Sequence, residues 1–131
     1  MAVSPLLVRP SVPDADGRVH AVTPESAGWT YIGFEVYDLA PGQRLARETG
    51  GQEVCVVMMS GTARVGAGGQ DFGTIGGRRS VFEGPAWSLY APAHSDFEVV
   101  AEGACEIAVC RAPGTGTVSY THLTLPTIYS V

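Results

Sequence analysis

The chain has 131 residues, of which 45% are hydrophobic, and this length and composition fit one globular domain with a buried core. Its formal net charge is −5, and its positive charge comes from eight dispersed arginines without any lysine, so the sequence offers no concentrated basic patch to a nucleic-acid backbone. No uncharged apolar run is long enough to cross a bilayer or to form a signal-peptide core. We therefore expect a cytoplasmic protein that binds neither nucleic acid nor membrane.

The chain contains three cysteines, Cys55, Cys105 and Cys110, and no two of them form a Cys-x-x-Cys pair. Their neighbours are mostly apolar, which is typical of cysteines inside a hydrophobic core. We expect buried, reduced thiols rather than a zinc or redox site.

Glycine and proline recur at short intervals, and the segments between them are rich in valine, isoleucine, phenylalanine and tyrosine, which predicts an all-β fold. The first expected element is a single helical turn at residues 23–26, because Thr23 can cap a helix and Pro24 fits its first turn. Residues 31–37 follow as a half-buried strand, in which Ile32, Phe34 and Val36 share one face.

The middle of the chain continues with short strands and turns. After Ala40-Pro41-Gly42, residues 43–48 are expected to be extended, and the continuous apolar run 54–59 predicts a central strand buried on both faces. Further strands are expected at residues 62–65, 87–91, 97–100 and 106–109. About ten antiparallel strands joined by turns favour a jelly roll with two packed sheets.

The last part of the chain differs from this pattern. Residues 112–131 contain no charged residue and are rich in threonine. The run VSYTHLTLP, residues 118–126, is similar to translated sequencing-adapter read-through. We therefore interpret residues 1–117 as the domain and residues 118–131 as a non-native tail.

Four stretches carry a family resemblance: TPESAGWTYIGFEVYDLAPG from Thr23, ETGGQEVCVVMMSGTARV from Glu48, GGQDFGTIGGRRSVFEGPAW from Gly68, and AVCRAPG from Ala108. Their order and spacing resemble the 5-deoxy-glucuronate isomerase family of bacterial inositol catabolism. Members of that family are longer chains that fold as two successive cupin β-barrels. The resemblance implies that this chain is the amino-terminal, cupin-type jelly-roll half, without the carboxy-terminal barrel, and that it is inactive alone.

The resemblance also implies a reaction, the ketol isomerisation of 5-deoxy-glucuronate to 2-deoxy-5-keto-gluconate. A base removes the proton next to a carbonyl, an enediolate forms, and the proton returns to the neighbouring carbon. A divalent metal can stabilise the enediolate as a Lewis acid. In related cupin uronate isomerases three histidines and one glutamate hold this metal in the carboxy-terminal barrel, so we expect the metal, zinc by preference, in the half that this chain lacks.

The cupin metal pattern can be placed on this sequence, but its ligands are missing. Anchoring the pattern on Glu53 puts Ala46 and Glu48 where the histidines belong, and the second motif puts Phe97 in the place of the last ligand. Two carboxylates without imidazoles suit neither tetrahedral zinc nor a typical non-haem iron site. We therefore predict no metal ligand and no catalytic residue in this barrel, with Glu48, Glu53 and His94 as the residues at the motif positions.

Other residues allow both a functional and a structural interpretation. His94 could act as an acid-base group, but a surface histidine in a turn is the favoured interpretation. Arg78 and Arg79 could bind the carboxylate of a uronate, and a solvated turn is favoured for them. Trp29 and Trp87 could stack on a sugar ring, and a core position is favoured for Trp29. The sequence assigns no substrate-contacting residue.

Two other functions remain open. A metal-less cupin could be a stand-alone module that binds a small sugar acid through arginine and aromatic contacts. It could also be an interaction domain with a filled barrel. For the intact protein we expect homo-oligomers, because a barrel without its neighbour leaves a face exposed.

Overall fold

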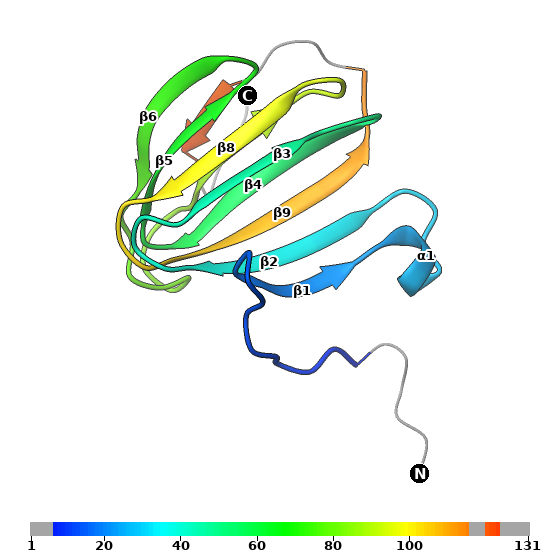
Figure 1. Ribbon diagram of the computed structural model, residues 1–131, viewed down its shortest axis with the longest axis horizontal. Coiled ribbons are helices and arrows are strands. Elements are labelled where there is room, and N and C mark those ends of the chain that lie inside the picture. Colours follow the sequence, from blue (N-terminus) through cyan, green and yellow to red (C-terminus); the bar gives the residue numbers. More distant parts are fainter. Residues whose placement is uncertain (1–6, 116–119, 124–131) are drawn as a thin grey trace.

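The computed structural model describes residues 7–115 and 120–123, which form two antiparallel sheets and one short helix (Figure 1). The all-β architecture and the single helical turn that the sequence predicts are confirmed. The elements are β1 (Arg18–Val22), α1 (Pro24–Ala27), β2 (Gly33–Leu39), β3 (Arg44–Glu48), β4 (Gln52–Ser60), β5 (Thr62–Ala67), β6 (Gln70–Gly76), β7 (Trp87–Ala91), β8 (Asp96–Ala101), β9 (Cys105–Pro113) and β10 (Tyr120–Leu123).

The chain crosses repeatedly between the two sheets. The larger sheet has the strand order β1-β2-β9-β4-β7-β10, and the smaller sheet has the order β3-β8-β5-β6. Consecutive strands such as β2, β3 and β4 therefore lie in alternate sheets, and apart from β1-β2 and β5-β6 the neighbours within a sheet are not consecutive in the chain. Figure 1 shows the smaller sheet packed over the larger one, with β1 and β2 along one edge. This arrangement is that of a jelly roll.

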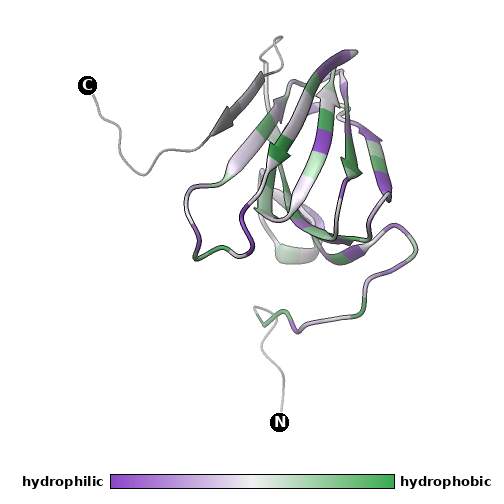
Figure 2. Ribbon diagram, turned by 90° about the vertical axis from the view of Figure 1, so that its left-hand side faces the viewer, coloured by the Kyte–Doolittle hydropathy of each residue, from purple (hydrophilic) through white to green (hydrophobic). Residues whose placement is uncertain are grey.

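The core lies between the sheets and consists of every second residue of the central strands. Hydrophobic and hydrophilic residues alternate along several strands in Figure 2. The inward positions include Val54, Val56, Met58, Leu89, Ile107 and Val109, all nearly inaccessible to solvent. The intervening residues of β4, such as Cys55 and Val57, are only half-buried, so the predicted burial of this strand on both faces is wrong.

The buried face of β2 is not the one that its apolar pattern emphasises. Tyr37 and Leu39 point into the core, while Phe34 and Val36 are half-buried on the outer face. Register explains this choice, because Tyr37 pairs with the buried Ile107 of β9 and directly opposed residues share a face.

The helical turn has the predicted capping residues. Thr23 Oγ1 accepts a hydrogen bond from Ser26 N at 3.1 Å, and Ser26 Oγ accepts one from Thr23 N at 2.9 Å. Gly28, at φ 71°, ends the turn in the left-handed conformation. Trp29 follows in the surface loop with 48% of its area exposed, so the predicted core position of Trp29 is wrong. Trp87 is half-buried and packs against the core.

Three strands lie outside the predicted set. β1 is a short edge strand beside β2, and β6 forms a hairpin with β5 from within the glycine-rich stretch. β10 pairs in register with β7, from Tyr120 opposite Tyr90 to Leu123 opposite Trp87. The remainder of the predicted non-native tail, residues 118–119 and 124–131, lies outside the described residues, and the domain boundary at residue 117 stays a prediction.

No helix in the described part of the chain is long and apolar enough to span a membrane.

Candidate functional site

The positions of the cupin metal pattern fall on both faces of the strands. Arg47 pairs with Phe97, which is buried in the core, and so Arg47 faces inward. Glu48 pairs with the exposed Asp96, and Glu53 precedes the inward-facing Val54. Glu48 and Glu53 therefore lie at outward-facing positions of two different sheets.

Two positions of the pattern, Glu48 and Glu53, therefore do not face the barrel interior, whereas Phe97 does. The inward positions of these strands carry Arg47, Val54 and Phe97, and none of these side chains is a metal ligand. Glu53 instead accepts a hydrogen bond from the Tyr90 hydroxyl at 2.7 Å on the outer face. Within residues 7–115 and 120–123, no group of three or more histidine, cysteine, aspartate or glutamate side chains is placed to hold a metal ion.

His94 lies in the turn between β7 and β8 and is exposed. Its backbone has φ 58°, and its N–H donates to the Gly50 carbonyl at 2.6 Å. These contacts support the interpretation of His94 as a surface turn residue.

Arg78 braces the loop between β6 and β7. Its guanidinium donates to the carbonyls of Met59 at 2.8 Å, Gly84 at 2.9 Å and Met58 at 3.3 Å. Arg79 is 89% exposed and pairs with Glu83 at 3.2 Å. The solvated-turn interpretation holds for Arg79 alone, because Arg78 is occupied in tying the loop to the end of β4.

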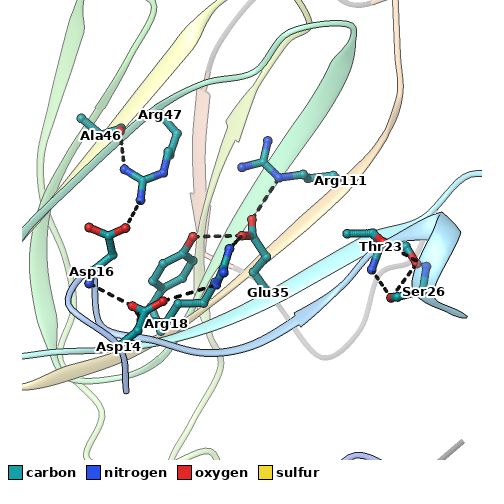
Figure 3. Close-up of polar contacts among 10 residues, drawn as sticks. Asp14, Asp16, Arg18, Thr23, Ser26, Glu35, Ala46, Arg47 and Arg111 are labelled. Carbon is teal, nitrogen blue, oxygen red and sulfur yellow. Dashed lines mark hydrogen bonds and ion pairs between the residues drawn. The ribbon is translucent and has the colours of Figure 1, made fainter. Parts of the chain in front are cut away.

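A cluster of polar side chains lies on the inward face of the larger sheet, at one end of the barrel. Glu35 accepts hydrogen bonds from Arg111 Nε at 3.1 Å and from the Tyr37 hydroxyl at 3.0 Å, and Arg18 Nη1 lies 3.5 Å from its Oε2. Figure 3 shows Glu35 between Arg18 and Arg111, which approach it from β1 and β9. We call these four residues, Arg18, Glu35, Tyr37 and Arg111, the Glu35 cluster.

Strand register places the Glu35 cluster in the barrel. Arg111 pairs with Gly33 on one side and with the buried Val54 on the other, and Glu35 pairs with the buried Val109. All of these positions face inward. The side chains of Arg111 and Glu35 are only 18% and 15% exposed, so their charges are partly removed from water.

Tyr37 contributes a hydroxyl that stays protonated. Burial, together with the nearby negative charge of Glu35, raises the pKa of Tyr37 to about 12. Below that pH the phenol is neutral, and it can serve as a fixed hydrogen-bond donor to the carboxylate.

The segment before β1 joins the rim of the barrel next to the Glu35 cluster. Asp16 pairs with Arg47 Nη2 at 3.0 Å, and Asp14 lies 3.7 Å from Arg18 Nε. The backbone N–H of Arg18 donates to Asp14 at 3.0 Å, and this bond lowers the pKa of the Asp14 carboxyl. Figure 3 shows both contacts at the start of β1.

A cavity of about 420 Å³ opens beside the Glu35 cluster. Its walls include Arg18, Glu35 and Arg111 of the cluster, together with Gln52 of β4 and the segment from Ala21 to Glu25. The volume lies within the range of small-molecule sites, roughly 300–1,000 Å³. The cavity can therefore hold a small polar ligand in contact with two guanidinium groups.

A second hollow of about 520 Å³ lies over the smaller sheet. Its charged side chains include the ion pairs Arg44–Glu98 and Arg64–Asp71, all largely exposed. The bond from Arg64 lowers the pKa of Asp71. Because these charges are paired and solvated, the hollow has weaker features of a binding site than the Glu35 cluster.

Sequence reasoning missed the Glu35 cluster. A signal was present, since Glu35 interrupts an apolar strand and Arg111 ends another. The two residues are 76 positions apart, and only the pairing of β2 with β9 brings them together.

Comparisons with known proteins agree with this fold. The KduI/IolB family model matches residues 6–129. Over 116 residues the chain is 47% identical to a 5-deoxy-glucuronate isomerase of Geobacillus kaustophilus, covering 88% of this chain and 42% of that protein. The crystal structure of an IolB-like protein from Salmonella typhimurium LT2 superposes with a TM-score of 0.78 at 37% identity, over 85% of this chain and 43% of that one.

The fold is shared more widely. The cupin domain of Cnp3 from Schizosaccharomyces pombe has a TM-score of 0.54 at 10% identity, over 72% of this chain and 62% of that one, and this likeness shows the cupin fold alone. The chain spans less than half the length of the 5-deoxy-glucuronate isomerase and of the IolB-like protein. With its family match over nearly all of its length, the chain belongs to the KduI/IolB family.

Proposed function

We propose that this chain is the amino-terminal, metal-free barrel of a bacterial 5-deoxy-glucuronate isomerase that acts in inositol catabolism in the cytoplasm. The observation that carries the proposal is the 47% identity to a relative of that name, over 42% of the relative's length. On this proposal the barrel alone does not isomerise sugar acids, because the rest of the protein holds the reaction centre.

The residues of this barrel do not fit a divalent metal. Beside the positions of the cupin pattern, the inward side chains are a cation, Arg47, and two hydrocarbon groups, Val54 and Phe97, where a cupin metal centre needs imidazoles and a carboxylate. This misfit supports a division of labour in which the carboxy-terminal barrel binds the metal, zinc by preference.

The outer face of the larger sheet supports a role in assembly. Phe34, Val36, Val57 and Cys110 lie on that face and are half-buried rather than covered. A partly exposed apolar sheet face is typical of a surface that packs against another domain or subunit. We propose that the intact protein covers it and forms homo-oligomers.

The second candidate function is a stand-alone module that binds a small sugar acid. The specific observation that favours it is the cavity at the Glu35 cluster, which is lined by two arginines.

Metal analysis and a turnover assay on the purified 131-residue chain test the main proposal. The chain is dialysed against zinc, iron(II) or manganese(II), its metal content is measured, and 5-deoxy-glucuronate is offered as substrate. The Geobacillus kaustophilus isomerase is the positive control. We expect substoichiometric metal and no turnover for the chain, and stoichiometric metal or measurable isomerisation would contradict the proposal.

A further inference from the structure

We propose that the cavity at the Glu35 cluster binds a small hydroxylated carboxylate, with the carboxylate on the guanidinium of Arg111. The inference rests on the geometry of the cavity and needs no metal. It also does not require the chain to be part of an isomerase, because the side chains that carry it all belong to this chain.

Arg111 uses only one edge of its guanidinium within the protein. Its Nε donates to Glu35 Oε1 at 3.1 Å, and among the described residues neither Nη has a hydrogen-bonding partner. Two parallel N–H groups in this fork match the two oxygens of a carboxylate. The side chain is 18% exposed and its charge is less screened than at the surface, so an anion bound there would gain more than one at a fully solvated arginine.

The charged side chains that line the cavity balance each other, with Arg18 and Arg111 against Glu25 and Glu35. Glu35 lies near both Arg111 and Arg18, at 3.1 Å and 3.5 Å, and it also accepts from the neutral Tyr37 hydroxyl. Asp14, the other carboxylate near Arg18, lies 3.7 Å from it, and the side chains of Arg18 and Asp14 are both nearly half exposed, at 46% and 48%. The least exposed charges are therefore one cation, Arg111, and one carboxylate, Glu35, so the binding capacity for an anion lies in the two Nη groups of Arg111.

The guanidinium is held in place before any ligand arrives. Its Nε is fixed by Glu35, which is in turn held by the Tyr37 hydroxyl. Because the receptor group is already ordered, a ligand loses little affinity to side-chain ordering.

Gly33 keeps the space next to Arg111 open. A Cβ built on Gly33 would lie 3.6 Å from Arg111 Cβ and 3.9 Å from Arg111 Cδ, at ordinary contact distance. Gly33 does not have the positive φ that would exclude other residues. A larger residue can therefore replace Gly33 without backbone strain, and its side chain would extend along Arg111 into the cavity.

The remaining walls suit the hydroxyl groups of a sugar acid. Gln52 and Glu25 line the same cavity, and their carboxamide and carboxylate oxygens can accept hydrogen bonds from hydroxyls, while the Gln52 amide can donate. Polar walls of this kind suit a ligand with hydroxyl groups better than a hydrocarbon chain. We therefore infer a polyhydroxylated acid rather than a fatty acid.

Titration of the isotopically labelled 131-residue chain, followed by NMR and calorimetry, tests the inference. D-Glucuronate is the probe, and D-glucose is the neutral sugar of matched size. We expect saturable shifts of the Gly33 and Arg111 amides with glucuronate, and binding of glucose at least about tenfold weaker, since one charge-assisted bidentate contact is lost.

Two variants examine the site in different ways. Gly33→Val fills the cavity and keeps Arg111, and Arg111→Lys keeps the positive charge but removes the fork. Each should weaken glucuronate binding about tenfold or more. Arg79→Met, which removes a surface arginine paired with Glu83, is the matched control and should leave binding unchanged.

The inference is overturned if glucuronate shows no binding at about millimolar concentration, if glucose binds equally well, or if folded Gly33→Val and Arg111→Lys chains both bind as the wild-type chain does. Circular dichroism and thermal melting establish that the variants are folded. Failure of this test leaves the isomerase assignment standing, because that assignment depends on metal content and turnover.

Discussion

Replacing Arg111 by methionine should expose the energetic role of the Glu35 cluster. Methionine has a similar length but no charge, so it leaves Glu35 inside the barrel without its nearest counterion, at 3.1 Å. Removing one partner of a fully buried pair costs about 3–5 kcal/mol, whereas an exposed pair contributes about 0–1 kcal/mol. The Arg111 and Glu35 side chains are 18% and 15% exposed, and Tyr37 and Arg18 stay near Glu35, so we expect a loss of about 2 kcal/mol.

Urea unfolding followed by circular dichroism measures this loss. Adding Glu35→Gln to the Arg111→Met chain should recover about 1 kcal/mol, because the amide needs no counterion. Arg79→Met, at an 89% exposed side chain, should change the free energy of unfolding by less than about 0.5 kcal/mol. The reasoning is refuted if Arg111→Met is as stable as the wild-type chain, or if the two substitutions are simply additive.

Three further substitutions test other parts of the structure. Burial and the facing Asp38 raise the pKa of Glu106. The protonated Glu106 carboxyl therefore stabilises the fold below the ordinary glutamate pKa, and this contribution disappears as pH rises through the raised pKa. In urea unfolding, Glu106→Gln should stabilise the chain by about 0.5 kcal/mol at pH 7 but not at pH 4. Gly76→Ala should cost about 2 kcal/mol or more, because Gly76 has φ 100° and a Cβ would lie 2.2 Å from the Gly61 carbonyl. Arg78→Met should cost about 1–2 kcal/mol and speed hydrogen exchange in residues 77–86, because it frees carbonyls of β4 and of the loop.

Matched controls accompany these substitutions. Gly69→Ala also changes a glycine of positive φ, at 79°, but nothing lies near its Cβ, so it should cost only about 1 kcal/mol. Arg79→Met should leave loop exchange unchanged. Equal costs for Gly69→Ala and Gly76→Ala would rule out a steric effect of the Gly61 carbonyl on Gly76. Unchanged hydrogen exchange in Arg78→Met would show that Arg78 does not hold the loop in place. A pH-independent effect of Glu106→Gln would rule out the carboxyl pair.

Most strands could be predicted because glycine and proline turns separate β-branched runs, and the capping residues of α1 gave a direct local signal. β6 was missed because Gly73 and Gly76, which look like turn residues in the sequence, lie within the strand and pair with β5. The buried face of β2 could not be chosen from the pattern, because the outer face of the larger sheet also carries apolar residues such as Phe34 and Val36.

The candidate site depends on register, which the sequence does not supply. A shift of one residue exchanges inward and outward faces, so a motif placed on Glu48 and Glu53 selected two outward carboxylates. Glu35 and Arg111 meet only because β2 pairs with β9, a strand that is distant from it in the sequence. Local patterns can identify charged residues within strands, but they cannot show which of them share a cavity.

The most direct test of the proposed function is a domain exchange. The segment of the Geobacillus kaustophilus isomerase that aligns with this chain is replaced by the matching 116 residues of this chain, and isomerisation of 5-deoxy-glucuronate is measured in the chimera. We predict a folded chimera with turnover and metal content close to those of the parent enzyme, because this barrel would replace a structural, metal-free half. A folded, metal-loaded chimera without turnover would contradict the claim that this chain is the amino-terminal barrel of such an isomerase.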